Sequence, residues 1–434
     1  MWHELSAFAL CLLVFVCLPA DAQDPGVITY RDQFVHGMYV QGDVTDFAQA
    51  AGMERWTYIG RMMDDIRAMG LTVIHPNNLD FADLPRWCAM ADARGLRVIA
   101  QGTGGLYNYY MWDPTDPFGS PDPVVRRQIY QSRVLPYFQS FAPTMRTNRT
   151  LLAYCLTEEV NLPGDLMVWE DLGDLTTAIR NMDPSHPGFV EHLDIPMALL
   201  SLQIQRPEML SFGPGTLWTG SWSQEVDDFE QWLEPVGRAC RQNNCAFYAV
   251  LESTMQFKRI GDAWVPRVWT PAAADYGLQA WLAWAEGAQG FDFWWYHTTR
   301  DQDPDHRELL LRGVRDENDM PTPVMNAITI LSSQLAPLST YITRLRIVED
   351  NGGLPYARAG SWVRLRVMQM PDTGVRFLLA VNKDTSNPQP IGADLSSLLP
   401  CGTQPTLVPD GTPVDAMTLQ VPPGQGVLLR LGCR

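Results

Sequence analysis

The chain has 434 residues, a formal net charge of −17 and 46% hydrophobic residues. This length and composition suit one large folded domain with a smaller one beside it, and they exclude a disordered chain. The acidic charge argues against nucleic acid and anionic membranes as partners, because both repel a negative protein. An uncharged substrate is compatible with it.

Residues 1–22 have the pattern of a secretory signal peptide. An apolar core from Phe8 to Leu18 is followed by the small-residue cleavage site Ala20-Asp21-Ala22. A membrane anchor is the competing interpretation, but the apolar run is short for a span. We therefore expect a secreted or periplasmic protein without stable membrane insertion.

The cysteines outside that segment do not have the spacing of a metal site. In an oxidising compartment bridges can form. The expected local pairs are Cys240 with Cys245 and Cys401 with Cys433. Cys155 lies within an apolar run, so we expect a buried thiol there.

Two early segments share one pattern, Gly70–Ile74 (GLTVI) and Gly95–Ile99 (GLRVI). Each follows an amphipathic helical pattern, and each glycine stands where that helix should end. The apolar run after the glycine is typical of a parallel strand covered on both faces. The repeated unit is therefore a helix followed by a buried strand.

Continuous apolar runs predict further strands of this kind along the chain. The expected strands are His36–Val40, Thr72–Pro76, Leu96–Gln101, Leu151–Thr157, Gly188–His192, Met209–Phe212, Ala246–Leu251 and Gly290–Trp295. Helical patterns separate most of them, which predicts a TIM (β/α)8 barrel. An open doubly wound sheet is the alternative, but no G-x-G-x-x-G motif opens the first unit. A last helix is expected at Pro323–Leu335.

The pattern changes after Leu335 to short strands separated by turn residues, such as Trp362–Met368 and Val375–Val381. This change predicts a small β-sandwich. The expected organisation is a signal peptide at 1–22, a catalytic barrel at 23–337 and a C-terminal β-sandwich domain at 338–434.

The predicted strands end in polar or aromatic residues, which is where a TIM barrel carries its chemistry. These residues are His75, Asn77, Asn78, Glu158, Glu159, His192, Glu252, Trp295 and His297. Trp218 follows the sixth strand. Alternation along a strand predicts opposite directions for the Trp294 and Trp295 side chains, one into the core and one available to a sugar.

The acids after strands four and seven are the most informative, because these strands lie on roughly opposite sides of the barrel mouth. A retaining glycosidase needs two carboxyl groups about 5–5.5 Å apart, one protonated and one ionised. Glu158 or Glu159 could face Glu252 in this way. The structural alternatives are an ion-paired strand end for the acids and a core position for each histidine.

These residues resemble those of clan A glycoside hydrolases, TIM barrels with an acid/base Glu after strand four and a nucleophilic Glu after strand seven. Many members carry Asn-Glu-Pro or Asp-Glu-Pro at strand four, and Glu158-Glu159-Val160 aligns with it. The resemblance implies that Glu159 is the acid/base and Glu252 the nucleophile. The tryptophan-rich strand Gly290–Trp295 also matches.

The sequence departs from the clan at three places. Glu158 stands where the clan often has a sugar-binding Asn, and strand two ends in His75 and Asn77 instead of the common Arg. Strand six shows no clear Tyr or His at its end.

The resemblance implies a secreted retaining glycoside hydrolase that cleaves a β-glycosidic bond without a cofactor or metal. Beside the catalytic pair, the residues expected to contact the carbohydrate are Glu158, His75, Asn77, Asn78, His192, Trp218, Trp295 and His297. The alternative is a non-catalytic glycan-binding barrel of the cell surface, which needs the aromatic residues but not both acids. A metal-assisted hydrolase built on His75, Glu191 and His192 is a further alternative.

Overall fold

The computed structural model describes residues 33–101, 122–158, 166–213, 222–261, 263–266, 273–302, 308–357, 361–399 and 403–432. The predicted signal segment 1–22 lies outside these ranges, as do Glu159, Trp218, Cys401 and Cys433.

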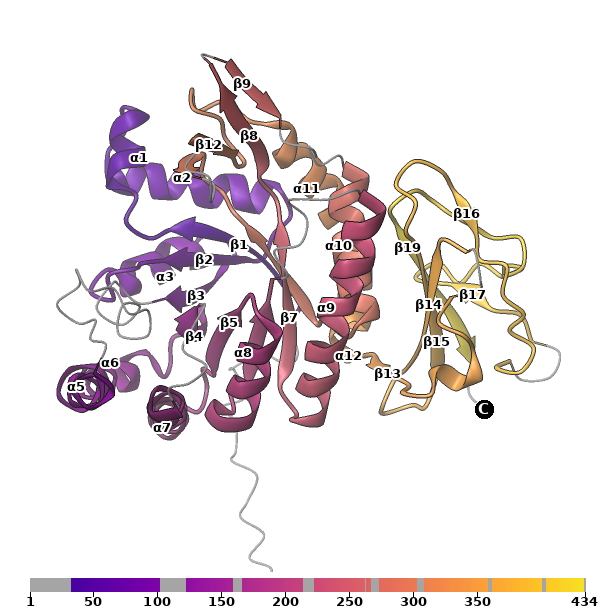
Figure 1. Cartoon of the computed structure of the whole chain (residues 1–434), viewed down its shortest axis with the longest axis horizontal. Helices are drawn as coiled ribbons and strands as arrows, with labels where there is room; N and C mark the ends of the chain where they lie inside the picture. The colour runs from indigo at the N-terminus through magenta and orange to yellow at the C-terminus, as the bar shows by residue number, and fades with distance from the viewer. Residues whose placement is uncertain are drawn as a thin grey trace, which may run out of the picture.

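Eight parallel strands form a closed barrel (Figure 1). They are β1 (Val35–Gln41), β2 (Val73–Asn77), β3 (Arg97–Gln101), β4 (Leu151–Glu158), β5 (Gly188–His192), β6 (Met209–Phe212), β7 (Ala246–Glu252) and β10 (Gly290–Trp294). The barrel closes because β1 pairs with β2 on one side and with β10 on the other. The predicted TIM barrel is confirmed, and the open sheet is wrong.

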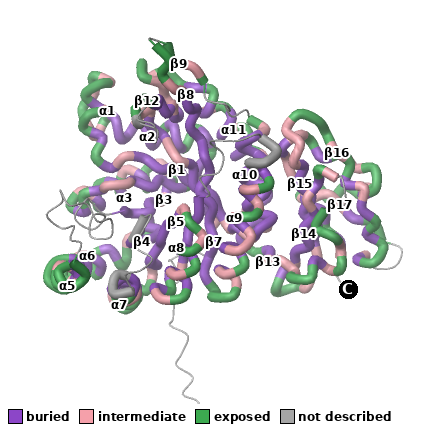
Figure 2. The backbone as a smooth tube through the Cα atoms, viewed as in Figure 1, coloured by how far each residue is buried: buried purple, intermediate pink, exposed green. Residues whose placement is uncertain are grey.

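Helices surround the barrel (Figures 1 and 2). They are α1 (Thr45–Ala50), α2 (Arg55–Ala68), α3 (Leu84–Asp92), α5 (Pro123–Ile129), α6 (Leu135–Met145), α7 (Leu166–Met182), α8 (Ile195–Leu200), α9 (Trp222–Gln242), α10 (Ala273–Ala285), α11 (Pro323–Leu335) and α12 (Ser339–Arg344). Short π-helical turns extend α5 and α8. The helix predicted at Pro323–Leu335 is confirmed.

The repeated helix–glycine–strand unit forms as predicted. Gly70 and Gly95 follow α2 and α3 with φ angles of 79° and 69°, in the left-handed region that glycine adopts without a Cβ clash. The next residues enter β2 and β3. The local sequence thus sets where each helix stops and each strand begins.

Side chains alternate between the inside of the barrel and the layer under the helices. The inner layers contain Val35, Val73, Ile99, Cys155, Phe189 and Tyr248 among other buried residues. The intervening positions, such as Val190 and Phe212, belong to the large core between the strands and helices. This alternation decides which residues at the strand ends face the mouth.

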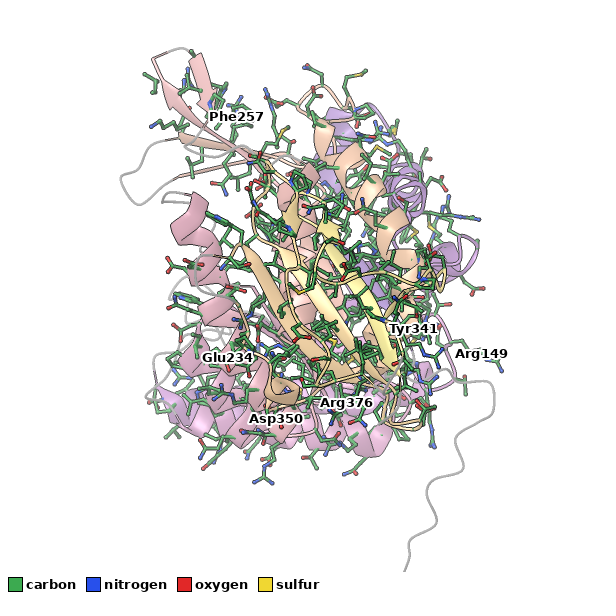
Figure 3. All side chains as sticks on the ribbon, turned by 90° about the vertical axis from the view of Figure 1, so that its right-hand side faces the viewer. Arg149, Glu234, Phe257, Tyr341, Asp350 and Arg376 are labelled. Atoms are coloured by element: carbon green, nitrogen blue, oxygen red, sulfur yellow. The ribbon has the colours of Figure 1, made fainter. Side chains whose placement is uncertain are left out.

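A four-stranded antiparallel sheet that the sequence did not reveal is built from two insertions at the mouth side. The strands β8 (Met255–Ile260) and β9 (Ala263–Pro266) follow β7, while β11 (Thr299–Gln302) and β12 (Glu308–Arg312) follow β10. Figure 3 marks its position by Phe257, at the end of the molecule away from Arg376 and Asp350.

The C-terminal part is a β domain, as predicted (Figure 3). Its five-stranded sheet consists of β13 (Arg346–Ile347), β14 (Val363–Gln369), β15 (Arg376–Asn382), β17 (Thr406–Leu407) and β19 (Gly426–Gly432). A second sheet pairs β16 (Gln389–Pro390) with β18 (Gln420–Val421). One face of the larger sheet and the segments around the smaller one form a separate core.

The other face of the large sheet packs against the barrel. Phe377, Leu379 and Val381 of β15 belong to the same buried cluster as α10. A Cβ atom on Gly277 of α10 would lie 2.8 Å from the carbonyl oxygen of Gly424. The β domain therefore rests on the helix that covers β7, with almost no space between the backbones.

A cluster of ion pairs joins the two domains beside this contact. Arg364 and Arg366 of β14 bind Glu286, which follows α10. Lys383 bonds to Asp227, with 2.5 Å between Nζ and Oδ1, and to Glu230 at 2.7 Å. The positive charges come from the β domain and the negative charges from the barrel.

The cysteine predictions have different outcomes. Cys240 is buried with a free thiol, so the predicted Cys240–Cys245 bridge is wrong. The two residues are linked through the backbone instead, since the Cys245 N–H donates to the Cys240 carbonyl. Cys155 is buried inside the barrel, as predicted.

None of the helices in the described ranges combines the length and the apolar character needed to cross a membrane.

Candidate active site

Buried polar side chains form the floor of the barrel mouth. The His75 Nδ1 atom lies 2.8 Å from Asp292 Oδ2, and the Tyr39 hydroxyl donates a hydrogen bond to the Glu191 carboxylate. The Tyr39 and His75 rings are in contact, with 4.0 Å between their centroids. All four side chains are at least 98% buried. They connect β10, β2, β1 and β5 across the barrel.

The absence of a side chain on Gly37 makes part of this network possible. Gly37 lies on β1 between β2 and β10, and a Cβ atom there would stand 2.8 Å from Asp292 Oδ1 and 3.3 Å from Val73 Cβ. The His75–Asp292 hydrogen bond thus passes over a strand that contributes no side-chain atom at this point.

Burial raises the pKa of Asp292 from its ordinary value, while the hydrogen bond from His75 acts in the opposite direction. Desolvation outweighs the partner because the carboxyl group is fully enclosed. His75, predicted to contact the carbohydrate, has no exposed surface. Its buried position under the mouth suits a structural role.

Glu252 ends β7 on the inward-facing side of the strand. Its residue is 9% exposed, more than the floor residues. One carboxylate oxygen accepts hydrogen bonds from the Thr254 backbone N–H at 2.7 Å and from the Thr254 hydroxyl at 2.5 Å. Two donors on one oxygen stabilise the ionised carboxylate.

Residues of α10 hold the backbone around Glu252. Gln279 bonds to both the N–H and the carbonyl of Glu252, and the Tyr276 hydroxyl donates to the Ser253 carbonyl at 3.2 Å. Burial raises the pKa of Tyr276 well above its ordinary value, and the nearby Glu252 charge adds to this effect. The hydroxyl therefore stays protonated and available as a donor.

The strand β4, whose end carries the predicted acids, lies three strands from β7 around the closed barrel. Glu158 is the last residue of β4 and pairs in register with Glu191, which faces inward. The register shifts between Cys155 and Thr157 along this pair of strands. Glu159, the predicted acid/base, lies outside the described residues.

Trp294 and Trp295 are not divided between core and surface as predicted. Both are half-buried, and their rings stack with centroids 5.6 Å apart and planes 11° from parallel. The peptide bond between Trp294 and Trp295 is cis, and the alternation of the strand does not continue from one to the other. Asn77 and Asn78 are half-buried at the end of β2, and Asn78 has a φ angle of 54°.

His192 does not face the mouth, which corrects the prediction made from its place at a strand end. It pairs in register with Phe212 and contacts Trp169 of α7, with ring centroids 5.8 Å apart. It is completely buried, and desolvation lowers its pKa to about 3. Glu191 takes the inward direction, so its neighbour must point under the helices.

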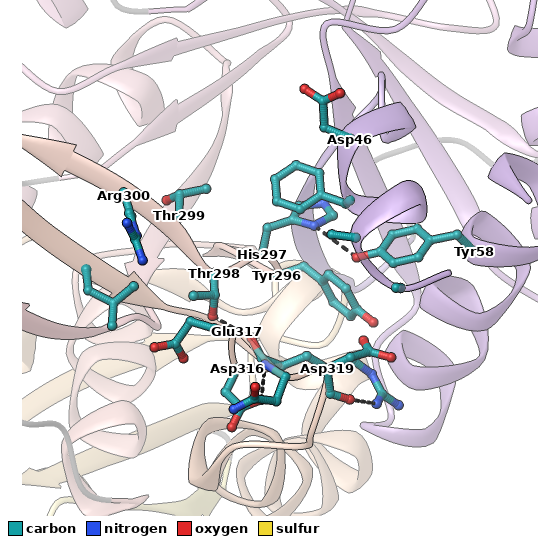
Figure 4. Close-up of a pocket in the computed structure, with 16 residues that line it drawn as sticks. Asp46, Tyr58, Tyr296, His297, Thr298, Thr299, Arg300, Asp316, Glu317 and Asp319 are labelled. Carbon is teal, nitrogen blue, oxygen red and sulfur yellow. Dashed lines mark hydrogen bonds between the residues drawn. The ribbon is translucent and has the colours of Figure 1, made fainter. Parts of the chain in front are cut away.

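His297 lies beside the mouth instead of at its centre. Its ring stacks on Phe47 of α1 at 4.2 Å and meets the Trp295 ring edge-on at 5.3 Å. Burial lowers its pKa to about 3, so the imidazole is neutral at physiological pH. Figure 4 shows it in the wall of a cavity, opposite Thr299 and Arg300.

The metal alternative built on His75, Glu191 and His192 is not supported by this geometry. His75 and His192 lie on opposite faces of the barrel wall, so one ion cannot bind both. Across the described ranges, no group of three or more His, Cys, Asp or Glu side chains has an arrangement that could hold a metal ion.

Sequence reasoning missed several residues that build this site. Tyr39 and Asp292 were treated as strand residues, although a polar group inside an apolar run such as GFDFWW is itself a signal of a buried partner. Thr254 follows Glu252 by two residues and is the position from which a hydroxyl reaches that carboxylate. The sequence around Gln279 does not indicate its role, because its hydrogen-bond partner Glu252 is distant in sequence.

No family model matches the chain, and no curated protein matches it. Among solved structures, a β-galacturonidase from Eisenbergiella tayi is similar at 13% identity and a TM-score of 0.47, over 70% of this chain and 51% of that one. A β-glucuronidase from Ruminococcus gnavus has 13% identity, a TM-score of 0.49, and coverages of 70% and 50%. A β-galactosidase from Marinomonas has 9% identity, a TM-score of 0.46, and coverages of 70% and 60%.

The aligned region thus spans only 50–60% of these larger structures. At this level of similarity no family is assigned, and the fold of the chain rests on its own strand order.

Proposed function

We propose that this chain is a secreted retaining glycoside hydrolase that cleaves a β-glycosidic bond in an oligo- or polysaccharide. The observation that carries the proposal is the placement of Glu252. It ends β7 at the mouth, is 9% exposed, and accepts two hydrogen bonds from Thr254 that stabilise its ionised form. The acidic end of β4 lies three strands away around the closed barrel.

The reaction follows from two carboxyl groups with different protonation states. The acid on the β4 side gives its proton to the glycosidic oxygen while a Glu252 oxygen attacks the anomeric carbon. The bond from the anomeric carbon to the leaving oxygen breaks, and a glycosyl ester of Glu252 forms. The β4 carboxylate then takes a proton from water, whose oxygen displaces Glu252, so the anomeric configuration is retained.

The resemblance gives the acid/base role to Glu159, with Glu158 beside it. Glu158 ends β4 in register with Glu191, which makes it the residue to compare. Trp295, Asn77 and Asn78 are half-buried around the mouth and suit contacts with the sugar, through stacking and hydrogen bonds. Trp218, which follows β6 in the sequence, is proposed as a further contact because an indole ring can stack on a sugar.

The test replaces the acids one at a time and measures hydrolysis of aryl β-glycosides. Glu252→Ala should abolish turnover, and added azide should restore it while producing a glycosyl azide of inverted configuration. Glu159→Gln should slow substrates with poor leaving groups far more than activated ones, and Glu158→Gln should not show this difference. The reverse pattern would move the acid/base role to Glu158.

The control is Glu208→Gln, which changes an acid at the other end of the barrel, where its carboxylate binds Arg180. Undiminished activity in Glu252→Ala would refute the proposal. Glycan binding without hydrolysis in the unaltered protein would support the non-catalytic alternative.

A further inference from the structure

A cavity of about 720 Å³ opens beside the mouth, where the connections after β1 and β10 leave the barrel. Its buried walls are Tyr58 of α2 and Tyr296 and His297 after β10, with Phe47 of α1 stacked on His297 (Figure 4). This size accommodates a small organic ligand, and mixed aromatic and polar walls are usual for such sites.

Most charged groups of this cavity already have partners that fix its shape. Arg315 binds Asp65 through two nitrogen atoms, at 2.6 and 2.9 Å. Asp319 pairs with Arg61, and Glu317 pairs with Arg312. The walls are therefore held in place before any ligand enters, which reduces the entropy lost on binding.

Two oppositely charged side chains line the cavity without a protein partner among the described residues. Asp46 of α1 and Arg300 of β11 make no hydrogen bond or ion pair within the part of the chain that the structure describes. Both are exposed and line the cavity. Their charges balance, so the two free groups favour a ligand with several hydroxyl groups over one with a net charge.

His297 supplies a third group. Its Nε2 atom is buried and has no hydrogen-bond partner in the described structure, and its Nδ1 atom lies 3.5 Å from the Tyr58 hydroxyl. A neutral imidazole in contact with Trp295 connects this cavity with the half-buried tryptophans of the mouth.

We infer that this cavity binds an additional neutral sugar unit of a chain whose cleaved bond lies at the mouth. The inference rests on the proposed function for the identity of the ligand. Phe47 and His297 provide the aromatic surface, while Asp46 and Arg300 hydrogen-bond to hydroxyl groups. The chain therefore discriminates between substrates by length, and uncharged oligosaccharides are its ligands.

The test measures binding to the full chain carrying Glu252→Gln, so that bound sugars are not consumed. Calorimetric titration uses β-linked oligosaccharides of glucose, mannose and xylose, each from two to six units. For the sugar that binds, affinity should increase by about tenfold at the length that fills the cavity, as expected for one stacked and hydrogen-bonded unit. Arg300→Met and Asp46→Asn should each remove most of this increase and leave the affinity for shorter oligomers unchanged.

Arg146→Met serves as the matched control, because Arg146 is exposed at the end of α6, before β4, and has no partner in the described structure. The inference is overturned if no neutral oligosaccharide binds, if affinity is independent of length, or if the increase survives in both cavity variants. Arg300-dependent binding of uronate oligomers alone would also overturn it.

Hydrolysis of aryl glycosides by the unaltered protein separates this inference from the proposed function. Cleavage without any effect of oligosaccharide length refutes the cavity assignment alone. Length-dependent and Arg300-dependent binding without cleavage refutes the proposed function and leaves the cavity assignment standing.

Discussion

The Gln279 side chain hydrogen-bonds to both the backbone N–H and the backbone carbonyl of Glu252. Its Oε1 atom accepts from the Glu252 N–H at 3.0 Å, and its Nε2 atom donates to the Glu252 carbonyl at 3.2 Å. Gln279 lies on α10 and is 98% buried. Because the β domain packs on the same helix, the position of Glu252 depends on contacts with both domains.

Replacing this side chain should loosen Glu252 without removing it. In Gln279→Met, two buried backbone groups lose their partners, at a cost of about 1–3 kcal/mol each in the free energy of unfolding. We expect faster hydrogen exchange at the Glu252 amide and at least a tenfold lower kcat, with little change in KM. Mass spectrometry of exchanged peptides and steady-state kinetics measure these effects.

Gln128→Met is the control for this change, because Gln128 is exposed on α5. Unchanged exchange at Glu252 in Gln279→Met would show that the side chain does not hold the strand end.

A methyl group on Gly37 should disturb the floor of the mouth. In Gly37→Ala the new Cβ atom meets Asp292 Oδ1 at 2.8 Å, and Asp292 cannot retreat easily because it is buried and bonded to His75. We expect a loss of about 1–3 kcal/mol in the free energy of unfolding, measured with urea. Gly60→Ala is a matched control, since Gly60 lies in α2 and the atoms nearest its Cβ position are the ends of Arg94 and Met90. That variant should be neutral or more stable.

Buried histidines should make the protein sensitive to acid. Desolvation lowers the pKa of His36, His192 and His297 from 6.5 to about 3 in the folded state. Between these values the unfolded chain binds protons that the folded chain does not, so stability is complete above pH 6.5 and falls as the pH decreases toward 3. The slope is about 1.4 kcal/mol per pH unit for each histidine.

His36→Phe should reduce this slope, because the new ring keeps the aromatic contacts with Phe34 and Phe293 but has no titratable group. Urea unfolding between pH 7 and 4 measures it. Phe293→Leu changes the same packing without altering a titration and should leave the slope as it was. Equal slopes in His36→Phe and the unaltered protein would contradict the assignment of acid sensitivity to His36.

The ion cluster between the domains should contribute through its buried members. Arg366 and Glu286 are 97% and 99% buried, and the Arg366 Nε–H also donates to the Ala285 carbonyl at 2.7 Å. Arg366→Met leaves part of the Glu286 charge unmatched, and we expect a loss of about 3–5 kcal/mol. Thermal and urea unfolding measure it.

The double variant Arg366→Met with Glu286→Gln should recover part of that loss, because the unmatched charge is gone. Arg259→Met is the control, since its pair with Glu308 is exposed to solvent and should contribute little to stability. A loss in Arg366→Met as small as that in the control would show that the buried pair does not stabilise the domain contact.

The barrel was predictable because eight continuous apolar runs alternate with helical patterns, and no dinucleotide-binding motif favours the open doubly wound sheet that shares such strands. The same pattern located Glu252 at the end of a strand. It did not locate Gln279 or Asp292 as partners, because their contacts join segments distant in sequence. The antiparallel sheet of β8, β9, β11 and β12 was missed for a related reason, since it pairs two short insertions from different loops.

At the end of a strand, a shift of one residue in register changes whether a side chain faces the inside of the barrel or the helices. The sequence alone does not give this register. His192 was expected at the mouth and lies under α7, while Glu191 points inward. A register shift between Cys155 and Thr157 likewise sets which residue of β4 pairs with Glu191.

The sequence by itself determined the (β/α)8 order, the C-terminal β domain and the strands whose ends carry acids. These features follow from local periodicity and from the free energy of burying apolar surface. Only the tertiary structure decided which polar side chains meet in the floor, how α10 holds Glu252 and how the cavity beside Trp295 is walled. Those contacts depend on barrel closure and strand register, which bring together groups that no local pattern connects.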